Sequence, residues 1–233
     1  MTLKRGMTAM TSAAARLPLL SPSLLRIYGL RSATVFVVAL LAVVVSTFML
    51  RDAATAQIIG AQKGYAGDNG PAFQAWLDTP GGVAVSPGGE LFIADSNNHV
   101  IRRVDAQNRN ISTVVGNNAL GPGFSGDFGP ATGAQLNTPD GVAIAPDGDL
   151  IVADSHNHRV RRIDRETGEI ITIAGSGDDG FSGDNGPATA AQLNTPSAVA
   201  AAGNGDIYIA DTLNYRIRMI DHLTGFIHTI AGT

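Results

Sequence analysis

The chain contains no cysteine and few aromatic or charged residues. Among its 233 residues there is one Trp, aromatic residues make up 6% and charged residues 15%. Without thiols the protein can form neither a disulfide nor a zinc–thiolate site, and it has no cysteine nucleophile. Packing and backbone hydrogen bonds must therefore hold the fold together.

Acidic residues are almost missing from the segment Met1–Ala56, which carries six Lys and Arg against the single acid Asp52. Residues 57–233 hold the other ten Lys and Arg but 19 Asp and Glu, a formal charge of −9. Nucleic-acid binding relies on Lys and Arg to neutralise phosphates. The acidic body therefore argues against a nucleic-acid partner, including RNA.

Charge is also absent from residues 33–50, an apolar run about long enough to span a bilayer as a helix. Residues 1–32 before it form a basic N-terminal region, and residues 51–56 after it end in Ala-Thr-Ala, a possible signal-peptidase site. A cleaved signal peptide and an uncleaved transmembrane anchor both fit. Either one would place the body on the extracytoplasmic side, membrane-anchored or secreted. An organelle transit peptide over residues 1–32 is a third interpretation.

From Gln57 onward the chain repeats itself three times. Each copy begins with Gly-Asp-Xaa-Gly-Pro-Ala, and the copies start at Gly67, Gly126 and Gly183. The second and third copies are identical at 31 of 50 positions. Such self-similarity indicates one structural unit built three times. The blocks that align without a gap are 67–116, 126–175 and 183–232.

Each block contains four short runs rich in β-branched residues, bounded by Gly, Pro, Asn and Asp. This pattern predicts four antiparallel strands. In the first block they are expected at Gly82–Val85, Leu91–Ala94, Val100–Val104 and Ile111–Val115. Four-stranded sheets that pack on their neighbours are blades of a β-propeller. The sequence thus predicts an all-β fold after an N-terminal hydrophobic helix, with one helical turn starting at Pro71, Pro130 and Pro187.

The second block, LNTPDGVAIAPDGDLIVADSHNHRVRRID, resembles the NHL-repeat family, in which Asn157-His158 and Val160 follow the N-H-R-I/V core. The third block departs from it at Tyr215. The resemblance covers residues 57–233 and implies blades of a propeller that usually has six. Three blades make an incomplete ring. A truncated sequence, an open half-ring and a homodimer that completes the ring are the three explanations.

Polar residues that recur in every block are expected to be structural, because each blade solves the same folding problem. The Asp that ends the second strand and the Asn of the following turn can bond backbone groups there. The Asp of the Gly-rich loop is expected to be structural too, and metal-binding carboxylates are the alternative for both sets of Asp residues. A recurrent Arg is expected to pair with blade acids or to lie solvated on an outer strand. The structural positions are Asp95, Asp154, Asp211, Asn98, Asn157, Asn214, Asp68, Asp127 and Asp184. The recurrent arginines are Arg102, Arg161 and Arg218.

Residues found in only one blade are better candidates for function. His156 and His158 form an H-x-H pair that could chelate a metal, although exposed turn histidines have the same appearance. Trp76 stands where the other blocks have Gln and could be a contact point or fill a gap at the edge of the first blade.

These features favour a non-catalytic binding or scaffold module for a protein, peptide or carbohydrate ligand, with no cofactor. The sequence has no nucleophile elbow, P-loop or H-E-x-x-H motif. The resemblance also admits a metal-dependent enzyme, because peptidyl-hydroxyglycine lyases and lactonase-like propellers place a metal in the central channel. In those enzymes several blades supply the ligands.

Overall fold

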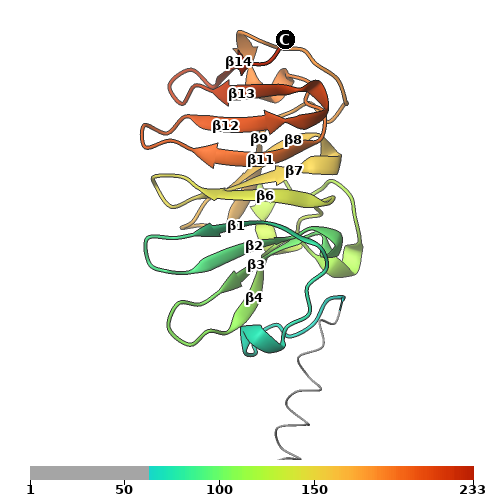
Figure 1. The fold of residues 1–233 in the computed structure, drawn as a ribbon, viewed down its shortest axis with the longest axis vertical. Coiled ribbons are helices and arrows are strands. Elements are labelled where there is room, and N and C mark those ends of the chain that lie inside the picture. Colours follow the sequence, from blue (N-terminus) through green and yellow to red (C-terminus); the bar gives the residue numbers. More distant parts are fainter. Residues whose placement is uncertain (1–62) are drawn as a thin grey trace, which may run out of the picture. The chain divides into compact units, whose positions relative to one another are not determined.

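The computed structural model describes residues 63–233, which form three antiparallel β-sheets (Figure 1). In the first sheet, strands adjacent in sequence are hydrogen-bonded neighbours. We call it blade 1; its strands are β1 (Pro80–Val85), β2 (Leu91–Asp95), β3 (Val100–Val104) and β4 (Ile111–Val115). The strands predicted for the first block are confirmed to within two residues.

Blades 2 and 3 repeat this sheet and add a short outer strand. The four main strands of blade 2 are β6 (Pro139–Ile144), β7 (Leu150–Asp154), β8 (Arg159–Ile163) and β9 (Glu169–Ala174). Those of blade 3 are β11 (Pro196–Ala201), β12 (Ile207–Asp211), β13 (Arg216–Ile220) and β14 (Phe226–Ala231). The added strands, β5 (Gly129–Pro130) on β9 and β10 (Gly186–Pro187) on β14, are absent from the sequence prediction. Each pairs only two residues, too few to give a periodic signal.

Short 3₁₀ turns connect the strands. Those predicted from the Pro-Ala motif are present, but Pro71 precedes its turn as the N-cap instead of opening it. The three Pro-Ala turns are η2 (Ala72–Gln74), η5 (Ala131–Gly133) and η7 (Ala188–Ala190). The turns between second and third strands are η3 (Ser96–Asn98), η6 (Ser155–Asn157) and η8 (Thr212–Asn214).

No helix among residues 63–233 is long and apolar enough to cross a membrane. The N-terminal hydrophobic helix predicted at 33–50, and the regions 1–32 and 51–56 on either side of it, lie outside the described residues.

The innermost strands β1, β6 and β11 pack side by side along the three blades. Glycine makes this approach possible. A Cβ on Gly82 would lie 2.7 Å from the Asp140 carbonyl oxygen, and one on Gly141 would lie 2.8 Å from Cα of Ala198. Both distances are shorter than a real side chain tolerates.

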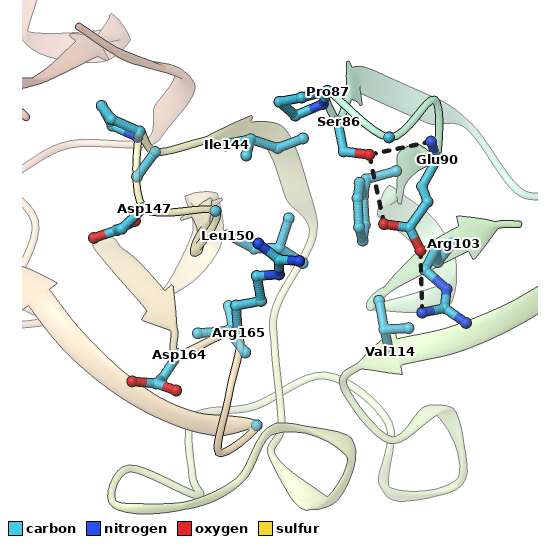
Figure 2. Close-up of a pocket in the computed structure, with 17 residues that line it drawn as sticks. Ser86, Pro87, Glu90, Arg103, Val114, Ile144, Asp147, Leu150, Asp164 and Arg165 are labelled. Atoms are coloured by element: carbon cyan, nitrogen blue, oxygen red, sulfur yellow. Dashed lines mark hydrogen bonds and ion pairs between the residues drawn. The ribbon is translucent and has the colours of Figure 1, made fainter. Parts of the chain in front are cut away.

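Blades 1 and 2 leave a crevice between their strand-connecting turns (Figure 2). Its volume is about 550 Å³. The turn over residues 86–90 borders one side, and the turn over residues 145–148 borders the other, together with Arg165. We call this space the blade 1–2 crevice.

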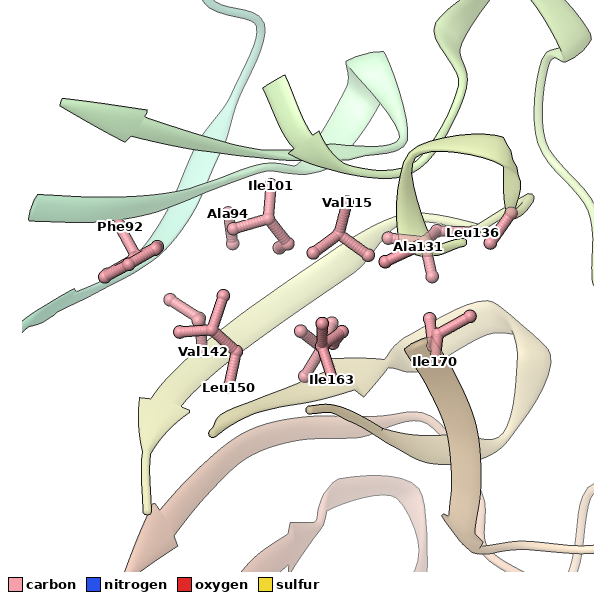
Figure 3. Close-up of a cluster of buried hydrophobic side chains, with 12 residues drawn as sticks. Phe92, Ala94, Ile101, Val115, Ala131, Leu136, Val142, Leu150, Ile163 and Ile170 are labelled. Atoms are coloured by element: carbon pink, nitrogen blue, oxygen red, sulfur yellow. The ribbon is translucent and has the colours of Figure 1, made fainter. Parts of the chain in front are cut away.

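Most of the core consists of apolar layers between neighbouring blades (Figure 3). Phe92, Ala94 and Ile101 of blade 1 face Val142 and Leu150 of blade 2. A second layer joins blade 2 to blade 3 through buried aliphatic residues that include Ile151, Val160, Ile209 and Ile227. Burial of these faces supplies the main driving force for stacking the blades.

Two sheet faces at the ends of the stack are more exposed than their internal counterparts. On blade 1, Val83 is 64% exposed, whereas the equivalent Val142 is 6% exposed. On blade 3, Ile217 is 38% exposed, whereas the equivalent Val160 is fully buried. Within residues 63–233, nothing covers these two faces as the neighbouring blades cover the internal ones.

Candidate functional site

An aspartate at the end of the second strand anchors each blade. In blade 2, Asp154 is fully buried and its Oδ1 accepts a hydrogen bond of 2.7 Å from the backbone N–H of Asn137. Asp95 and Asp211 make the same 2.7 Å bond to the backbone N–H of Asp78 and Asn194. The sequence led us to expect bonds to the backbone of the turn that follows. Instead, the carboxylate ties the second strand to the loop that precedes the first strand.

The second carboxylate oxygen holds the Asn of the turn and the recurrent Arg. Asp154 Oδ2 accepts from Asn157 Nδ2 at 2.8 Å and from the Arg161 guanidinium at 3.3 Å. Asn157 also donates to the carbonyl oxygen of Gly123 at 2.7 Å. Blades 1 and 3 repeat these contacts with Asp95, Asn98 and Arg102, and with Asp211, Asn214 and Arg218.

The three recurrent arginines lie fully buried between two carboxylates each. Arg161 contacts Asp127 at 2.7 Å, in addition to Asp154. Arg102 and Arg218 pair with Asp68 and Asp184 at 2.6 and 2.7 Å. Burial raises the pKa of Asp154 to about 6, while the Asn137 N–H, Asn157 and Arg161 act in the opposite direction. We call this Asp–Asn–Arg–Asp arrangement the blade network; it uses the expected structural positions and pairs the arginines with acids.

An aromatic ring covers each buried arginine. The Phe124 ring lies 4.8 Å from the Arg161 guanidinium and 3.8 Å from that of Arg159. Phe181 stacks on Arg218 and Arg216 at 4.9 and 3.8 Å, and Tyr65 lies 5.0 Å from Arg102. Stacking of this kind stabilises a guanidinium. The sequence analysis missed these rings because they precede the gapless blocks, although each ring stands at the same distance ahead of its copy.

Two histidines link one blade to the next. The Nδ1 atom of His99 accepts from the backbone N–H of Thr138 at 3.1 Å, and that of His158 accepts from Thr195 at 3.2 Å. Each bond therefore requires an unprotonated Nδ1. Burial lowers the pKa of His99, the nearby His156 lowers it further, and Asp78 raises it.

The H-x-H pair lies at the turn η6. His156 is exposed, whereas His158 has a left-handed backbone (φ 52°) and uses its Nδ1 for the bond to blade 3. A metal bound to His158 would have to use Nε2. Across residues 63–233, no group of three or more His, Asp or Glu side chains is arranged to hold a metal ion. The two-histidine site stays a prediction.

Trp76 lies in the loop before β1 and is 40% exposed. Its backbone N–H donates to the carbonyl oxygen of Ala66. Ser125 and Gln135 form the equivalent bridge in blade 2. The indole ring borders Gly64. Trp76 thus covers the start of blade 1 and keeps an accessible surface.

Three antiparallel sheets with four main strands each, stacked through their faces, define a β-propeller fold, and the blade network repeats in each of them. The NHL repeat family matches residues 77–103 and 136–163, and the teneurin NHL domain family matches residues 172–221. The chain belongs to the NHL-repeat family.

Several known proteins are similar to parts of the chain. SUPPRESSOR OF QUENCHING 1, chloroplastic, from Arabidopsis thaliana is 37% identical over 150 residues, which is 61% of this chain and 14% of that protein. Human NHL repeat-containing protein 2 is 30% identical over 156 residues, 64% of this chain and 21% of that protein. The chain thus matches only a small part of either relative. An auxiliary nutrient binding protein from Bacteroides ovatus is 23% identical with a TM-score of 0.49, covering 64% of this chain and 37% of that one.

Proposed function

We propose that the propeller segment is a non-catalytic interaction module that binds a protein through side chains that differ from blade to blade. The recurrent polar residues hold each blade together, so their hydrogen-bonding capacity serves the scaffold. The residues left to contact a partner are those that break the repeat.

The main observation behind this proposal is the conformation of Phe128. It adopts a left-handed backbone with φ 65°, as do Asn69 and Asn185 at the same repeat position. Asn tolerates this conformation well, whereas a bulky aromatic residue is strained in it. The Phe128 side chain is nevertheless 79% exposed, so burial in the blade does not offset the strain. Strain retained at an exposed aromatic residue indicates a functional contact.

A second position, next to Phe128, is also apolar in blade 2 and polar in blade 3. In blade 3, Asn185 Oδ1 lies 2.9 Å from Nδ1 of His228 on β14. In blade 2 the two equivalent residues are Phe128 and Ile171. Blade 2 therefore presents an apolar pair at its rim where blade 3 presents a polar one, and such a pair suits an apolar pocket on a protein partner.

Photo-crosslinking in intact source cells tests this function. A benzoylphenylalanine placed at position 128 of the full chain is expected to give one dominant adduct with another protein, identified by mass spectrometry. The same residue at positions 69 and 185 is the control, because these sites share the backbone conformation of Phe128. Identical adducts at all three positions, or no adduct at 128, would count against a contact surface on blade 2.

We also propose that this module lies on the extracytoplasmic side. The support is the uncharged segment 33–50 with five basic residues before it. Protease added to intact cells should then digest the propeller segment while a cytoplasmic marker survives. Protection of both until the cells are lysed would refute the proposed location.

A further inference from the structure

The blade 1–2 crevice combines an aliphatic wall with a guanidinium that pairs with no carboxylate of residues 63–233. Val114, Ile144, Leu150 and Ile163 contribute the apolar surface, together with the Phe92 ring. Figure 2 shows Arg165 reaching into the space from the blade 2 side. A volume of about 550 Å³ lies within the range of small-molecule sites.

The acids around the crevice are already engaged. Glu90 pairs with Arg103 at 3.3 Å and accepts from the Ser86 hydroxyl. Asp147 pairs with Arg162. Asp164 accepts the backbone N–H groups of the turn that follows it, which lower its pKa. Within the described part of the chain, Arg165 is thus the cation of the crevice that pairs with no carboxylate.

Local sequence directs Arg165 into the crevice. Gly148 has φ 94°, a conformation that favours glycine, and the Arg165 stem lies over it: a Cβ there would be 2.8 Å from Cδ of Arg165. Asp149, whose Oδ1 accepts the backbone N–H of Arg165, is held by the Arg162 side chain at 2.6 Å. The guanidinium is therefore not drawn back onto its own blade.

The equivalent residue of blade 3 behaves differently. His222 occupies the repeat position of Arg165, and its Nδ1 lies 2.8 Å from Oδ1 of Asp206. This hydrogen bond, together with those from the backbone N–H of His222 and from the Asn204 side chain, lowers the pKa of Asp206 to about 2. In blade 1 the position is Ala106. An available cation beside an apolar wall is thus a property of Arg165 and not of the repeat.

We propose that the blade 1–2 crevice binds an aliphatic monocarboxylate, with its chain along Ile144 and Leu150 and its carboxylate on Arg165. A guanidinium binds a carboxylate through two parallel hydrogen bonds, and the apolar wall removes the chain from water. This site is independent of the contact role proposed for Phe128.

Calorimetric titration of the full chain with decanoate and with decan-1-ol tests the site. Decanoate should bind saturably, and Arg165→Gln should weaken it tenfold or more, as expected for loss of a charge-assisted pair. The affinity for decan-1-ol should stay within about twofold, because the alcohol uses only the apolar wall. His222→Gln is the matched control and should leave decanoate binding unchanged.

A second variant tests the apolar wall of the crevice. Ile144→Asp places a like charge in the apolar wall at a half-buried position and should abolish decanoate binding while circular dichroism remains that of the wild type. Absence of saturable decanoate binding, equal binding by wild type and Arg165→Gln, or an equal loss in His222→Gln would each overturn the proposal.

Discussion

His99 shows how a single residue couples blade packing to pH. Its Nδ1 accepts the Thr138 N–H, and the pKa of its ring is lowered by burial and by His156. The folded protein therefore binds the proton less readily than the unfolded chain, whose His pKa is about 6.5. This contribution to stability is complete above about pH 6.5 and declines as the pH falls.

We expect the full chain to lose less stability between pH 7.5 and 5.5 when His99 is replaced by Asn. Asn accepts the left-handed backbone of this position (φ 58°) and does not titrate. The raised pKa of Asp154, about 6, acts in the same pH range with the opposite sign, and the comparison between the two proteins cancels it. Urea unfolding at both pH values measures the difference. Identical pH dependence in both proteins would show that the His99 bond does not contribute.

Phe128→Asn should stabilise the protein by about 1 kcal/mol, because Asn relieves the left-handed strain. The shift in the urea midpoint measures this gain. Phe73→Thr is the control: Phe73 is 78% exposed, lies in an ordinary 3₁₀ turn, and stands where the other blades have Thr132 and Thr189. Its replacement should change stability by less than about 0.5 kcal/mol. Equal effects of the two substitutions would show that the backbone conformation of Phe128 does not cost stability.

At the scale of elements, the docking of inner strands depends on glycine. Gly141→Ala should lower the free energy of unfolding by about 1–3 kcal/mol, because its Cβ would meet the backbone of β11 at 2.8 Å. Gly133→Ala is the control, since no neighbouring atom of the described residues lies within 4 Å of its Cβ position. Urea midpoints of the two variants should differ clearly. If Gly141→Ala unfolds like Gly133→Ala, the blades do not pack as closely as described.

The strands were predictable because alternation, turn residues and the repeat all indicate the same elements. The sequence located β2, β3 and β4 to within one residue and singled out the polar positions that the blade network joins. It missed β5 and β10, because a pairing of two residues leaves no pattern. Their partners are also distant in the chain, since Gly129 pairs with Ile170 and Gly186 pairs with Ile227.

The candidate sites were less predictable than the strands. The histidine bonds and the crevice both arise where one blade docks on another, and sequence alone does not give that geometry. Arg165 looks like an ordinary turn residue until Gly148 and Asp149 are placed beside it. The strain at Phe128 could have been inferred, because the equivalent residues are both Asn and the preceding Asp is shared.

At the scale of the whole molecule, the outer face of blade 3 differs from the faces that receive a neighbour. Ala198 replaces Gly82 and Gly141, and Tyr215 replaces the linking histidines. A homodimer that completes the ring by the same docking would bring the Ala198 methyl group against partner backbone. We therefore expect β11 and the partner's inner strand to lie farther apart in such a ring than the inner strands of neighbouring blades do. The molar mass of the full chain in solution decides whether two copies associate.

The central claim is that residues shared by all three blades stabilise the blades, while residues found in only one blade are available to bind a partner or ligand. Arg161 and Arg165 both belong to blade 2 and differ in this respect. Arg161→Met leaves Asp154 buried without its cation and should lower the free energy of unfolding by about 3–5 kcal/mol. Arg165→Met should change it by less than about 0.5 kcal/mol. Urea unfolding of the two variants is the most direct test, and equal losses of stability would contradict the account.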